Sequence, residues 1–600
     1  MTKSPCTLSL LHNQIDFTCV PFSDRGSRLL VFTTPERSSF YVKLAERLTS
    51  IEPGIEAYLQ RPPFIHDLYL IDENGEPLDF ELDSWPHVLF MKTRVGEFAL
   101  TFGDSNTIAI GLPSDIVAGI RFSVSPQIWK VLQSGGEIKG VRNLAYTSNG
   151  DAVQNKITPE QSGYNIQFIV QSGADTAIIL SIGQRLTPGM EVAAFSSLYR
   201  QAEQRWQEWF ACVPPVNDRY LRAYAYAWWV MANNLIQPAG TISYEAMMPS
   251  KVNYVGLWLW DSAMHALAYR HINPEMARNQ LRVMLMHQLP DGMLPDAIYD
   301  EGVISEIDHP LKARVTKPPI LAWAALKLHE MAPDLAFLQE IYVPLVRLNA
   351  WWFSMNDDDV DGLVQYNHPY SSGLDDNPLW DYGMPVESPD LNTYLCVQMG
   401  SLALMAEFLG MENEGAMWRR RTKAIVQRMI DDFWDADAGI FRATHEGKFI
   451  PVITPFNLYP LWTGQMPDDI RARLLAHLTN PEEFWGTFPI PSVARNDSHY
   501  DPETMWRGPT WVNVNYFFIE ALQQIGEYAL ACDLREKTLD MILAVPGMYE
   551  YYNAETGQAP PRAAEAFGWT AAVFIDLAIA ATQEEEEDEN EDKNHPKTDP

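Results

Sequence analysis

The sequence predicts a mainly α chain of two parts, an N-terminal β-sandwich followed by a larger domain of stacked helical hairpins. Short runs of alternating apolar residues recur over residues 1–195, which is the period of half-buried strands. From Asn217 onward the apolar residues follow the helical period instead. A chain of 600 residues is also too long for one small core, which favours more than one domain.

The β-rich part is residues 1–195. Its strand-like runs are SRLLVF, SFYVKL, HDLYLI, HVLFMK, FALTF, TIAIGL, IRFSV, NIQFIV and AIILSIG, with turn signals such as Asn74-Gly75 and Gly135-Gly136. Many short strands with such spacing are typical of a β-sandwich. Residues 196–216 change to helical spacing and reach Pro214-Pro215, so we interpret them as a linker helix and a domain boundary.

Residues 217–582 form the predicted helical domain. Helices are expected over 217–237, 261–271, 274–288, 318–331, 335–355, 391–410, 413–433, 467–478, 510–531, 533–544 and 567–581. Helical content alone does not distinguish a closed ring from an open solenoid. However, long loops over 238–260, 289–317, 356–390, 484–509 and 546–566 alternate with short connections. Long ordered loops usually build a site, so the alternation indicates an (α/α) toroid with one functional face.

The charge and the cysteines limit the class of protein and its partners. A formal charge of −34 argues against nucleic acid or anionic membranes, because polyanions need clustered Lys and Arg. The acidic residues 583–600 cannot bury a core and are expected to be a disordered tail. No signal peptide and no run of 18 apolar residues is found, and the five cysteines are scattered. We therefore expect a soluble, cytoplasmic protein, while the oligomeric state stays open.

Each long loop combines aromatic residues with acids or amides, as in NYVGLWLWDSAMHA, HPYSSGLDDNPLWD and MYEYYNAETG. Aromatic faces stack on the C–H faces of sugar rings, and carboxylates bind the hydroxyl groups. A set of polar groups among aromatic walls is a default ligand-site hypothesis. Any single Trp is more often core than ligand contact, but the recurrence in five loops favours a small oligosaccharide or glycoside as partner.

The blocks WDSAMHA, GLDDNP, WRGPTWVNVNY, MYEYYNAETG and FGWTAA resemble, in this order, the motifs of glycoside hydrolase family 63. That family contains processing α-glucosidase and the mannosylglycerate and glucosylglycerate hydrolases, and trehalases are more distantly similar. The resemblance covers roughly residues 220–580. It implies an (α/α) toroid of six hairpins and an inverting hydrolase without a cofactor. Matched position by position, it makes Asp375 the general acid and Glu550 the general base.

The chemistry of these two residues agrees with the resemblance. An inverting glycosidase needs a protonated carboxylic acid at the leaving oxygen and an ionised carboxylate on the other face of the sugar. Apolar walls raise the pKa of an acid by desolvation, and Pro378 and Trp380 follow Asp375 closely. The alternative for Glu550 is a solvated loop acid. The neighbouring Asp376 would raise the pKa of Asp375 by like-charge repulsion, or is simply a surface acid.

Further site residues follow from the same blocks. Asp261 is expected to bind sugar hydroxyls. Arg507 either shapes the site or pairs with a loop acid, and Gln288 either contacts sugar or is a polar helix end. The remaining candidates for substrate binding are Trp260, Lys317, Trp380, Trp506, Trp511 and Trp569.

Two positions depart from the family pattern. Lys317 stands where the family often has Gln, and Ser371-Ser372 stand where it often has Glu-Ser. Lys317 either holds an anionic aglycone such as glycerate or pairs with a nearby acid. The substrate cannot be copied from any one member of the family for this reason.

The acidic segment NDDDVDG, residues 356–362, begins like a calcium-binding loop. Its twelfth position is His368 instead of the bidentate Glu that an EF-hand needs, so an acidic turn is the better interpretation. HEGKF at 445–449 lacks the second His of a zinc motif. The sequence therefore predicts no metal site.

Two other functions stay open at this point. One is an inverting phosphorylase, which would need a cationic phosphate site and no base carboxylate. The other is a carbohydrate-binding relative without activity, against which the retention of Asp375 and Glu550 argues.

Overall fold

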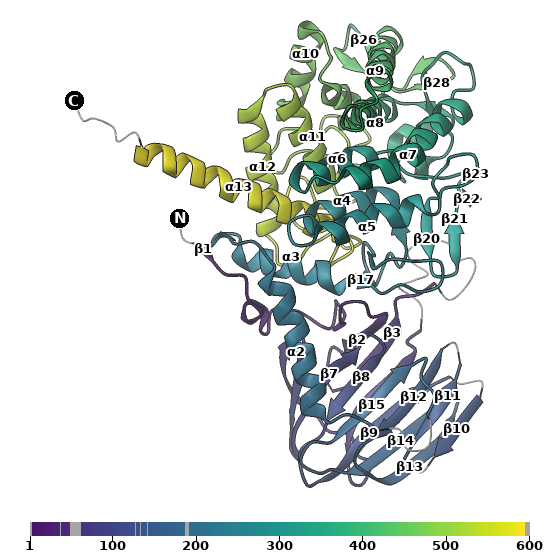
Figure 1. Ribbon diagram of the computed structural model, residues 1–600, viewed down its shortest axis with the longest axis vertical. Coiled ribbons are helices and arrows are strands. Elements are labelled where there is room, and N and C mark those ends of the chain that lie inside the picture. Colours follow the sequence, from purple (N-terminus) through teal and green to yellow (C-terminus); the bar gives the residue numbers. More distant parts are fainter. Residues whose placement is uncertain are drawn as a thin grey trace. The chain divides into compact units, whose positions relative to one another are not determined.

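A computed structural model describes residues 3–36, 38–47, 62–125, 128–132, 134–140, 142–161, 163–186 and 191–594. The chain divides into two compact units. The first consists of Met1–Gln237 and Ser250–Val255, and the second of Pro238–Pro249 and Gly256–Pro600. The first is rich in strands and the second in helices, which confirms the coarse order predicted from the sequence (Figure 1).

Two antiparallel sheets form most of the first unit. The eight-stranded sheet contains β5 (Glu81–Trp85), β6 (Val88–Thr93), β7 (Gly96–Asp104), β8 (Thr107–Gly111), β10 (Ile128–Leu132), β11 (Gly135–Lys139), β12 (Asn143–Ser148) and β15 (Ala177–Ile182). The six-stranded sheet contains β2 (Leu29–Thr33), β3 (Phe40–Leu44), β4 (Ile65–Asp72), β9 (Val117–Val124), β13 (Asp151–Glu160) and β14 (Gly163–Gln171). Their strand orders are β10-β11-β12-β15-β8-β7-β6-β5 and β13-β14-β9-β4-β3-β2.

The inner faces of the two sheets pack on each other as in a sandwich. The ring of Tyr146 in β12 lies edge-on to Phe122 of β9 and Phe168 of β14, at centroid distances of 5.7 and 5.4 Å. Helix α2 (Phe195–Ala211) covers part of the eight-stranded sheet, where a Cβ on Gly111 would lie 2.6 Å from the Phe195 ring. Strand β8 is thus covered on both faces, which explains its unbroken run of buried residues.

The division between the units lies later in the chain than the predicted boundary at 196–216. Helix α3 (Leu221–Asn233), which was expected in the helical domain, belongs to the first unit. The indole of Trp209 in α2 donates to the carbonyl of Trp228 in α3 at 3.0 Å. The backbone of Gly26 also pairs with β17 (Leu235–Ile236). These contacts tie α3 to the β-rich unit, and sequence periodicity does not report them.

The second unit is built from helical hairpins. Its helices are α4 (Leu259–Tyr269), α5 (Pro274–Leu285), α6 (Leu321–Met331), α7 (Leu335–Met355), α8 (Pro389–Phe408), α9 (Glu412–Phe433), α10 (Asp468–Leu478), α11 (Val512–Gln524), α12 (Tyr528–Leu543) and α13 (Gly568–Asn594). Consecutive helices pack in the pairs α4–α5, α8–α9 and α11–α12, and α13 packs back on α4. Capping residues fix several helix starts. For example, Asp334 accepts the N–H of Phe337 at 3.0 Å ahead of α7.

Three local predictions differ from the structure. The helix expected over 510–531 is broken between α11 and α12, because Gly526 adopts φ +81° and ends the first helix. The segment Pro455–Thr463 is a buried 3-10 helix, η4, that was not predicted. Helix α13 continues to Asn594 and so includes residues 583–594, which were expected to be disordered. A bidentate pair of Glu584 with Arg535 of α12 holds the start of that segment, while residues 595–600 lie outside the described residues.

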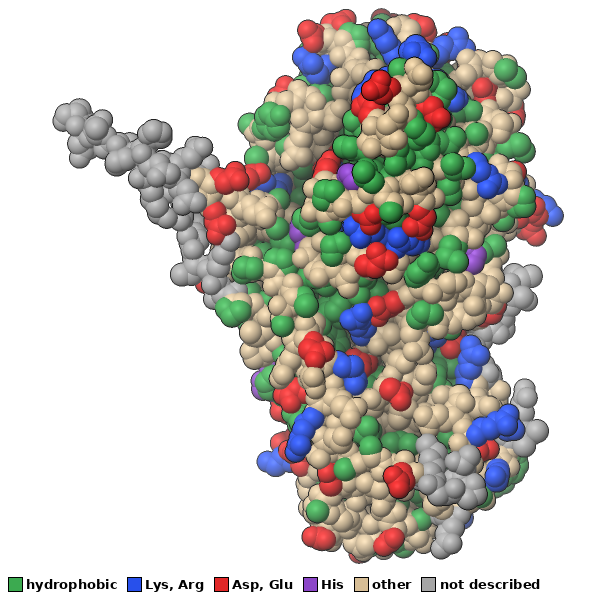
Figure 2. Space-filling model, viewed as in Figure 1, with side chains coloured by type: hydrophobic (Ala, Val, Ile, Leu, Met, Phe, Trp, Pro, Cys, Tyr) green, Lys and Arg blue, Asp and Glu red, His purple; other side chains and the backbone are tan. Residues whose placement is uncertain are grey.

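The distribution of surface charge and the length of the helices are relevant to which partners the protein can bind. On the face in Figure 2, Lys and Arg side chains are interspersed with Asp and Glu and do not form one patch. On α5, for example, Arg282 pairs with Glu275 and Glu340. Within the described part of the chain, no helix has the length and apolar character needed to cross a membrane.

Candidate active site

Two short 3-10 helices, η2 (Pro369–Ser371) and η3 (Pro378–Tyr382), flank Asp375. They fix the loop that bears it, residues 369–382, which we call the acid loop. The hydroxyl of Ser372 donates to the Pro369 carbonyl at 2.5 Å and accepts the N–H of Leu374 at 2.9 Å. The indole N–H of Trp380 donates to the Leu374 carbonyl at 2.6 Å. The second of the two unusual serines and the predicted Trp380 therefore both hold the backbone directly before Asp375.

Asp375 has the surroundings of a general acid. Its Oδ1 is buried, and no hydrogen-bonding group of the described residues is paired with it. Burial raises the pKa of Asp375 to about 7. The ammonium of Lys317 opposes this rise, and the negative charges of Asp296 and Asp376 add to it. A carboxylic acid that keeps its proton near neutral pH is what protonation of a leaving group requires.

Asp376 occupies a fixed position beside the acid. Its Oδ1 accepts the backbone N–H of Trp506 at 2.9 Å. Burial raises the pKa of Asp376 as well, against the opposing effects of this hydrogen bond and of Arg507. Asp376 thus joins the acid loop to the WRGPTW block and adds a like charge next to Asp375.

Gly373 allows the acid loop to lie against the indole of Trp260. It adopts φ +75°, and a Cβ there would lie 2.3 Å from both Cη2 and Cζ2 of Trp260. The indole has little room to move, because the rings of Trp506 and Trp569 lie 6.1 and 5.4 Å from it. A glycine at position 373 is therefore a packing requirement of the site.

Gly373→Ala is expected to destabilise the acid loop by about 2–4 kcal/mol, the sum of left-handed strain and overpacking. The measurement is kcat/KM together with the thermal unfolding midpoint, and both should fall. Gly447→Ala is the matched control, since Gly447 has φ +68° but open space around its Cα. Equal losses in the two variants would show that the contact with Trp260 is unimportant.

Glu550 lies on the second loop of the site, in the predicted MYEYYN block. It is 3% exposed. Its N–H donates to the Ala564 carbonyl at 2.9 Å, and its carboxylate accepts the Ala564 N–H at 3.3 Å. The indole of Trp569 donates to the Glu550 carbonyl at 3.1 Å. Both the backbone and the side chain of Glu550 are thus held in place, which excludes the alternative of a solvated loop acid.

A cluster of four tryptophans joins the two loops. Trp506 and Trp511 are stacked with ring centroids 3.6 Å apart, and Trp569 lies 5.5 Å from Trp511 and 5.4 Å from Trp260. All four are buried. Since Trp260 contacts Gly373 and Trp569 binds the Glu550 backbone, the cluster brings the elements of the predicted acid and base together.

Asp261 and Lys317 lie in the same group of charges. Asp261 is in the first turn of α4, and burial raises its pKa well above the usual value. The charge of Lys317 opposes that rise, and Glu550 and Asp296 add to it. Lys317 Nζ donates to Asp296 Oδ1 at 2.6 Å, which is the second of the two roles considered for this lysine.

Asp296 was not singled out by sequence reasoning, although it lies in the loop block HQLPDGMLPD. It directly precedes β20 (Ala297–Tyr299), which pairs with β19 (Leu257–Trp258). Because β19 runs into α4, this pairing brings Asp296 close to Asp261. A long-range strand pair of this kind leaves no mark in the local sequence.

Arg507 and Gln288 have structural partners. Arg507 forms a bidentate ion pair with Asp381 at 2.7 and 2.9 Å, which is the loop-acid alternative. The amide of Gln288 donates to the carbonyls of Gly292 and Pro344 at 2.8 and 2.7 Å. The contacts of Gln288 tie the end of α5 to its surroundings, as expected for a polar helix end.

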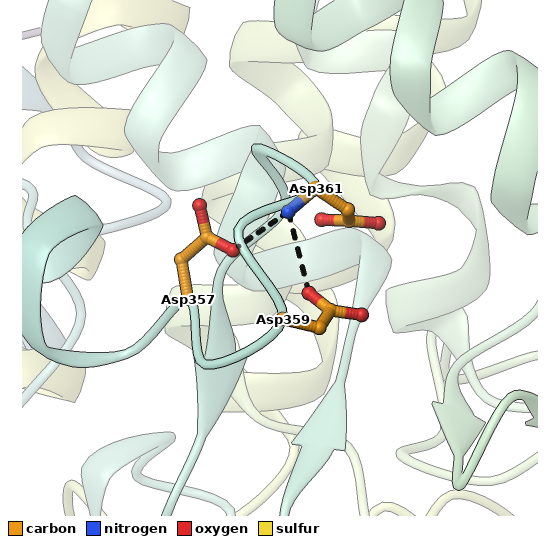
Figure 3. Close-up of side chains that lie close together, drawn as sticks. All are labelled: Asp357, Asp359 and Asp361. Atoms are coloured by element: carbon orange, nitrogen blue, oxygen red, sulfur yellow. Dashed lines mark hydrogen bonds between the residues drawn. The ribbon is translucent and has the colours of Figure 1, made fainter.

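The acidic segment at 357–361 is a turn in which a backbone N–H donates to carboxylates of the same segment (Figure 3). Carboxylate oxygens of Asp357, Asp359 and Asp361 lie within 4.8 Å of one another. The N–H of Asp361 donates to Asp357 at 3.1 Å and to Asp359 at 3.4 Å. His368, the twelfth position, has other partners. Its Nε2 lies 3.1 Å from the His309 carbonyl oxygen, and its Nδ1 accepts the N–H of Tyr370 in the acid loop at 3.1 Å.

Comparison with known proteins adds to this geometry. Residues 254–570, more than half of the chain, match the model of the mannosylglycerate hydrolase MGH1-like glycoside hydrolase domain. A mannosylglycerate hydrolase of Thermus thermophilus is 27% identical over 55% of this chain and 95% of its own. A glucosylglycerate hydrolase of Mycolicibacterium hassiacum is 23% identical over 54% of this chain and 92% of its own.

Solved structures show a shared fold. A glycoside hydrolase family 63 mannosylglycerate hydrolase from Thermus thermophilus, in complex with glucose, superposes with a TM-score of 0.51 and 24% identity, covering 59% of this chain and 99% of that one. A bacterial glucoamylase complexed with acarbose reaches a TM-score of 0.56 at 11% identity, over 97% of this chain and 96% of its own. The resemblance to family 63 is confirmed. The chain belongs to the MGH1-like family of glycoside hydrolase domains.

Proposed function

We propose that this glycosidase is an inverting hydrolase of an α-linked glucoside or a related α-glycoside. The observation that carries the proposal is the state of Asp375, a carboxyl with a buried, unpaired oxygen and a pKa raised to about 7. Such a group is a proton donor at neutral pH. Glu550, fixed on the other loop by Ala564, supplies the second carboxylate that glycoside hydrolysis needs.

In the proposed reaction, Asp375 gives its proton to the glycosidic oxygen while the bond to the anomeric carbon breaks. Glu550 takes a proton from a water that attacks the opposite face, so the anomeric configuration inverts. Asp261 binds sugar hydroxyls, and the cluster of Trp260, Trp506, Trp511 and Trp569 excludes water from Asp375. Asp375 is ionised after each turnover. Its raised pKa lets it take a proton back from solvent, and Glu550 releases the proton it has gained.

The helical unit is proposed to be a closed (α/α) toroid. Successive hairpins and the return of α13 onto α4 support a closed ring over an open solenoid. The long loops with Asp375 and Glu550 then lie on one face of that ring.

The five cysteines are free, which supports a cytoplasmic location.

A screen of substrates identifies the sugar and the aglycone that this enzyme accepts. Relatives are named for mannosylglycerate, for glucosylglycerate and, in Schizosaccharomyces pombe, as a probable mannosyl-oligosaccharide glucosidase. We expect cleavage of at least one member of a panel of α-linked glucose disaccharides, glucosylglycerate and mannosylglycerate. The first product seen by NMR should be the β-anomer, whereas an initial α-anomer would contradict inversion. Parallel assays with and without inorganic phosphate test for phosphorolysis. Added phosphate should not increase turnover.

A further inference from the structure

The ion pair of Lys317 and Asp296 has no place in the proposed reaction, yet it lies within the site. Lys317 Nζ donates to Asp296 Oδ1 at 2.6 Å and to the Tyr370 carbonyl at 2.5 Å. Both side chains are 8% exposed. A buried ion pair costs much of its attraction in desolvation, so it is a weak source of stability. Another role in the site is therefore a better explanation for it.

The pair connects two segments that are distant in sequence. The N–H of Asp296 donates to the Ile304 carbonyl at 2.7 Å, which anchors it to β21 (Gly302–Ile304). Tyr370, whose carbonyl binds Lys317, belongs to η2 in the acid loop. A second contact runs alongside, because the N–H of Thr316 donates to Ser371 Oγ at 3.3 Å. Lys317 thus fastens the loop of Asp375 to the strand segment that carries Asp296.

The charged and titratable groups around Asp375 come from several elements. Lys317 and Asp296 act on it from the preceding long loop, and Asp376 and Tyr370 from its own loop. His368, next to that loop, also interacts with Lys317 and Asp296. Asp261 in α4 belongs to the same group of charges, because it interacts electrostatically with Lys317, Asp296 and Glu550. In this group Lys317 and Asp296 bring opposite charges whose effects on Asp375 oppose each other.

We propose that Asp296 is a positioning residue for catalysis that acts through Lys317. It holds the ammonium on the Tyr370 carbonyl and balances its charge, so the acid loop is fixed and Asp375 keeps its proton up to about neutral pH. Without Asp296, the unbalanced ammonium would favour ionised Asp375. Without Lys317, the unbalanced carboxylate would favour the protonated form. The inference rests on the proposed role of Asp375 as general acid.

The test is the pH dependence of kcat/KM for the α-linked disaccharide of the panel that is cleaved fastest. Its alkaline limb reports the proton of the acid in the free enzyme. Asp296→Asn should move this limb to lower pH, and Lys317→Gln should move it to higher pH, each by about 1 unit. The double variant should bring the limb back between them. Opposite shifts with partial restoration are a signature that a loss of packing does not produce.

Controls separate this inference from folding and from the proposed function. Glu520→Gln breaks the pair of Glu520 with Lys327 (2.7 Å) and should leave the limb in place. Asp296→Glu should restore the wild-type limb. If Lys317→Gln fails to fold, Asp296→Asn and the double variant still give the two positions to compare. Shifts in the same direction, or lower kcat with an unmoved limb, would overturn the inference. If Asp375→Asn itself keeps full activity, the proposed function fails instead.

Discussion

Asp375→Asn is expected to lower kcat/KM for an α-linked disaccharide by about 10²–10⁴-fold, the usual contribution of a general acid. Asn has the same shape but carries no transferable proton. On α-glucosyl fluoride the loss should be much smaller, because fluoride leaves without protonation. Glu550→Gln should lower the rates of both substrates, because either reaction needs the activated water. The pair of substrates thus distinguishes the acid from the base within one assay.

The pH profile gives the same assignment independently. Since the active form of Asp375 is protonated and its pKa is raised to about 7, activity should fall as the pH rises through that value. Asp375→Asn should lack this alkaline limb. Asp468→Asn is a suitable control because the side chain of Asp468 is 90% exposed. Equal losses of Asp375→Asn on the disaccharide and on the fluoride would contradict the acid role.

The environment of Asp375 was accessible from the sequence because much of it is local. Pro378 and Trp380 follow it closely, and the structure shows Trp380 bound to the carbonyl of the preceding residue. Gly373 was also visible in the GLDD block, although its contact with Trp260 was not. The segment of chain that carries a motif encodes its loop geometry, so short-range reasoning reaches this far.

The partner of Lys317 was beyond such reasoning. Asp296 comes near the acid through the pairing of β19 with β20, which joins positions about forty residues apart in the chain. The sequence offered two roles for Lys317 and no means to choose between them. Long-range contacts also explain why the predicted domain boundary is misplaced. Helix α3 joins the β-rich unit through the hydrogen bond between Trp209 and Trp228, which sequence periodicity does not report. The helix break at Gly526 follows from the backbone conformation of that one residue. The apolar period is judged over a window of many residues, so it does not detect such a break.

Asp576→Asn is expected to lower the thermal midpoint of the helical unit by about 4–7 °C, from a loss of about 3–5 kcal/mol. Asp576 in α13 accepts hydrogen bonds from Arg270, His271 and Tyr516, each at 2.7 Å. These partners lie at the end of α4 and in α11, so one carboxylate joins three helices. Asn keeps the volume but leaves Arg270, whose side chain is only 12% exposed, without its paired carboxylate, which is the costly step.

The dependence of this loss on pH identifies its electrostatic origin. Burial alone would raise the pKa of Asp576, but Arg270, His271 and Tyr516 more than offset it, so the pKa lies well below its usual value. A lowered pKa contributes stability above the unfolded value of about 3.9, and this contribution is lost as the pH falls below it. The difference in midpoint between wild type and Asp576→Asn should therefore narrow as the pH falls below about 4.

The matched control is Glu407→Gln, which removes an exposed bidentate pair with Arg419. It should change the free energy of unfolding by less than about 1 kcal/mol at any of these pH values. Circular dichroism at the helical band follows the second unit, which contains most of the helices. A loss for Asp576→Asn that does not narrow in acid would assign the effect to packing and not to charge. A loss as small as that of the control would mean that the three helices are held together by their apolar contacts alone.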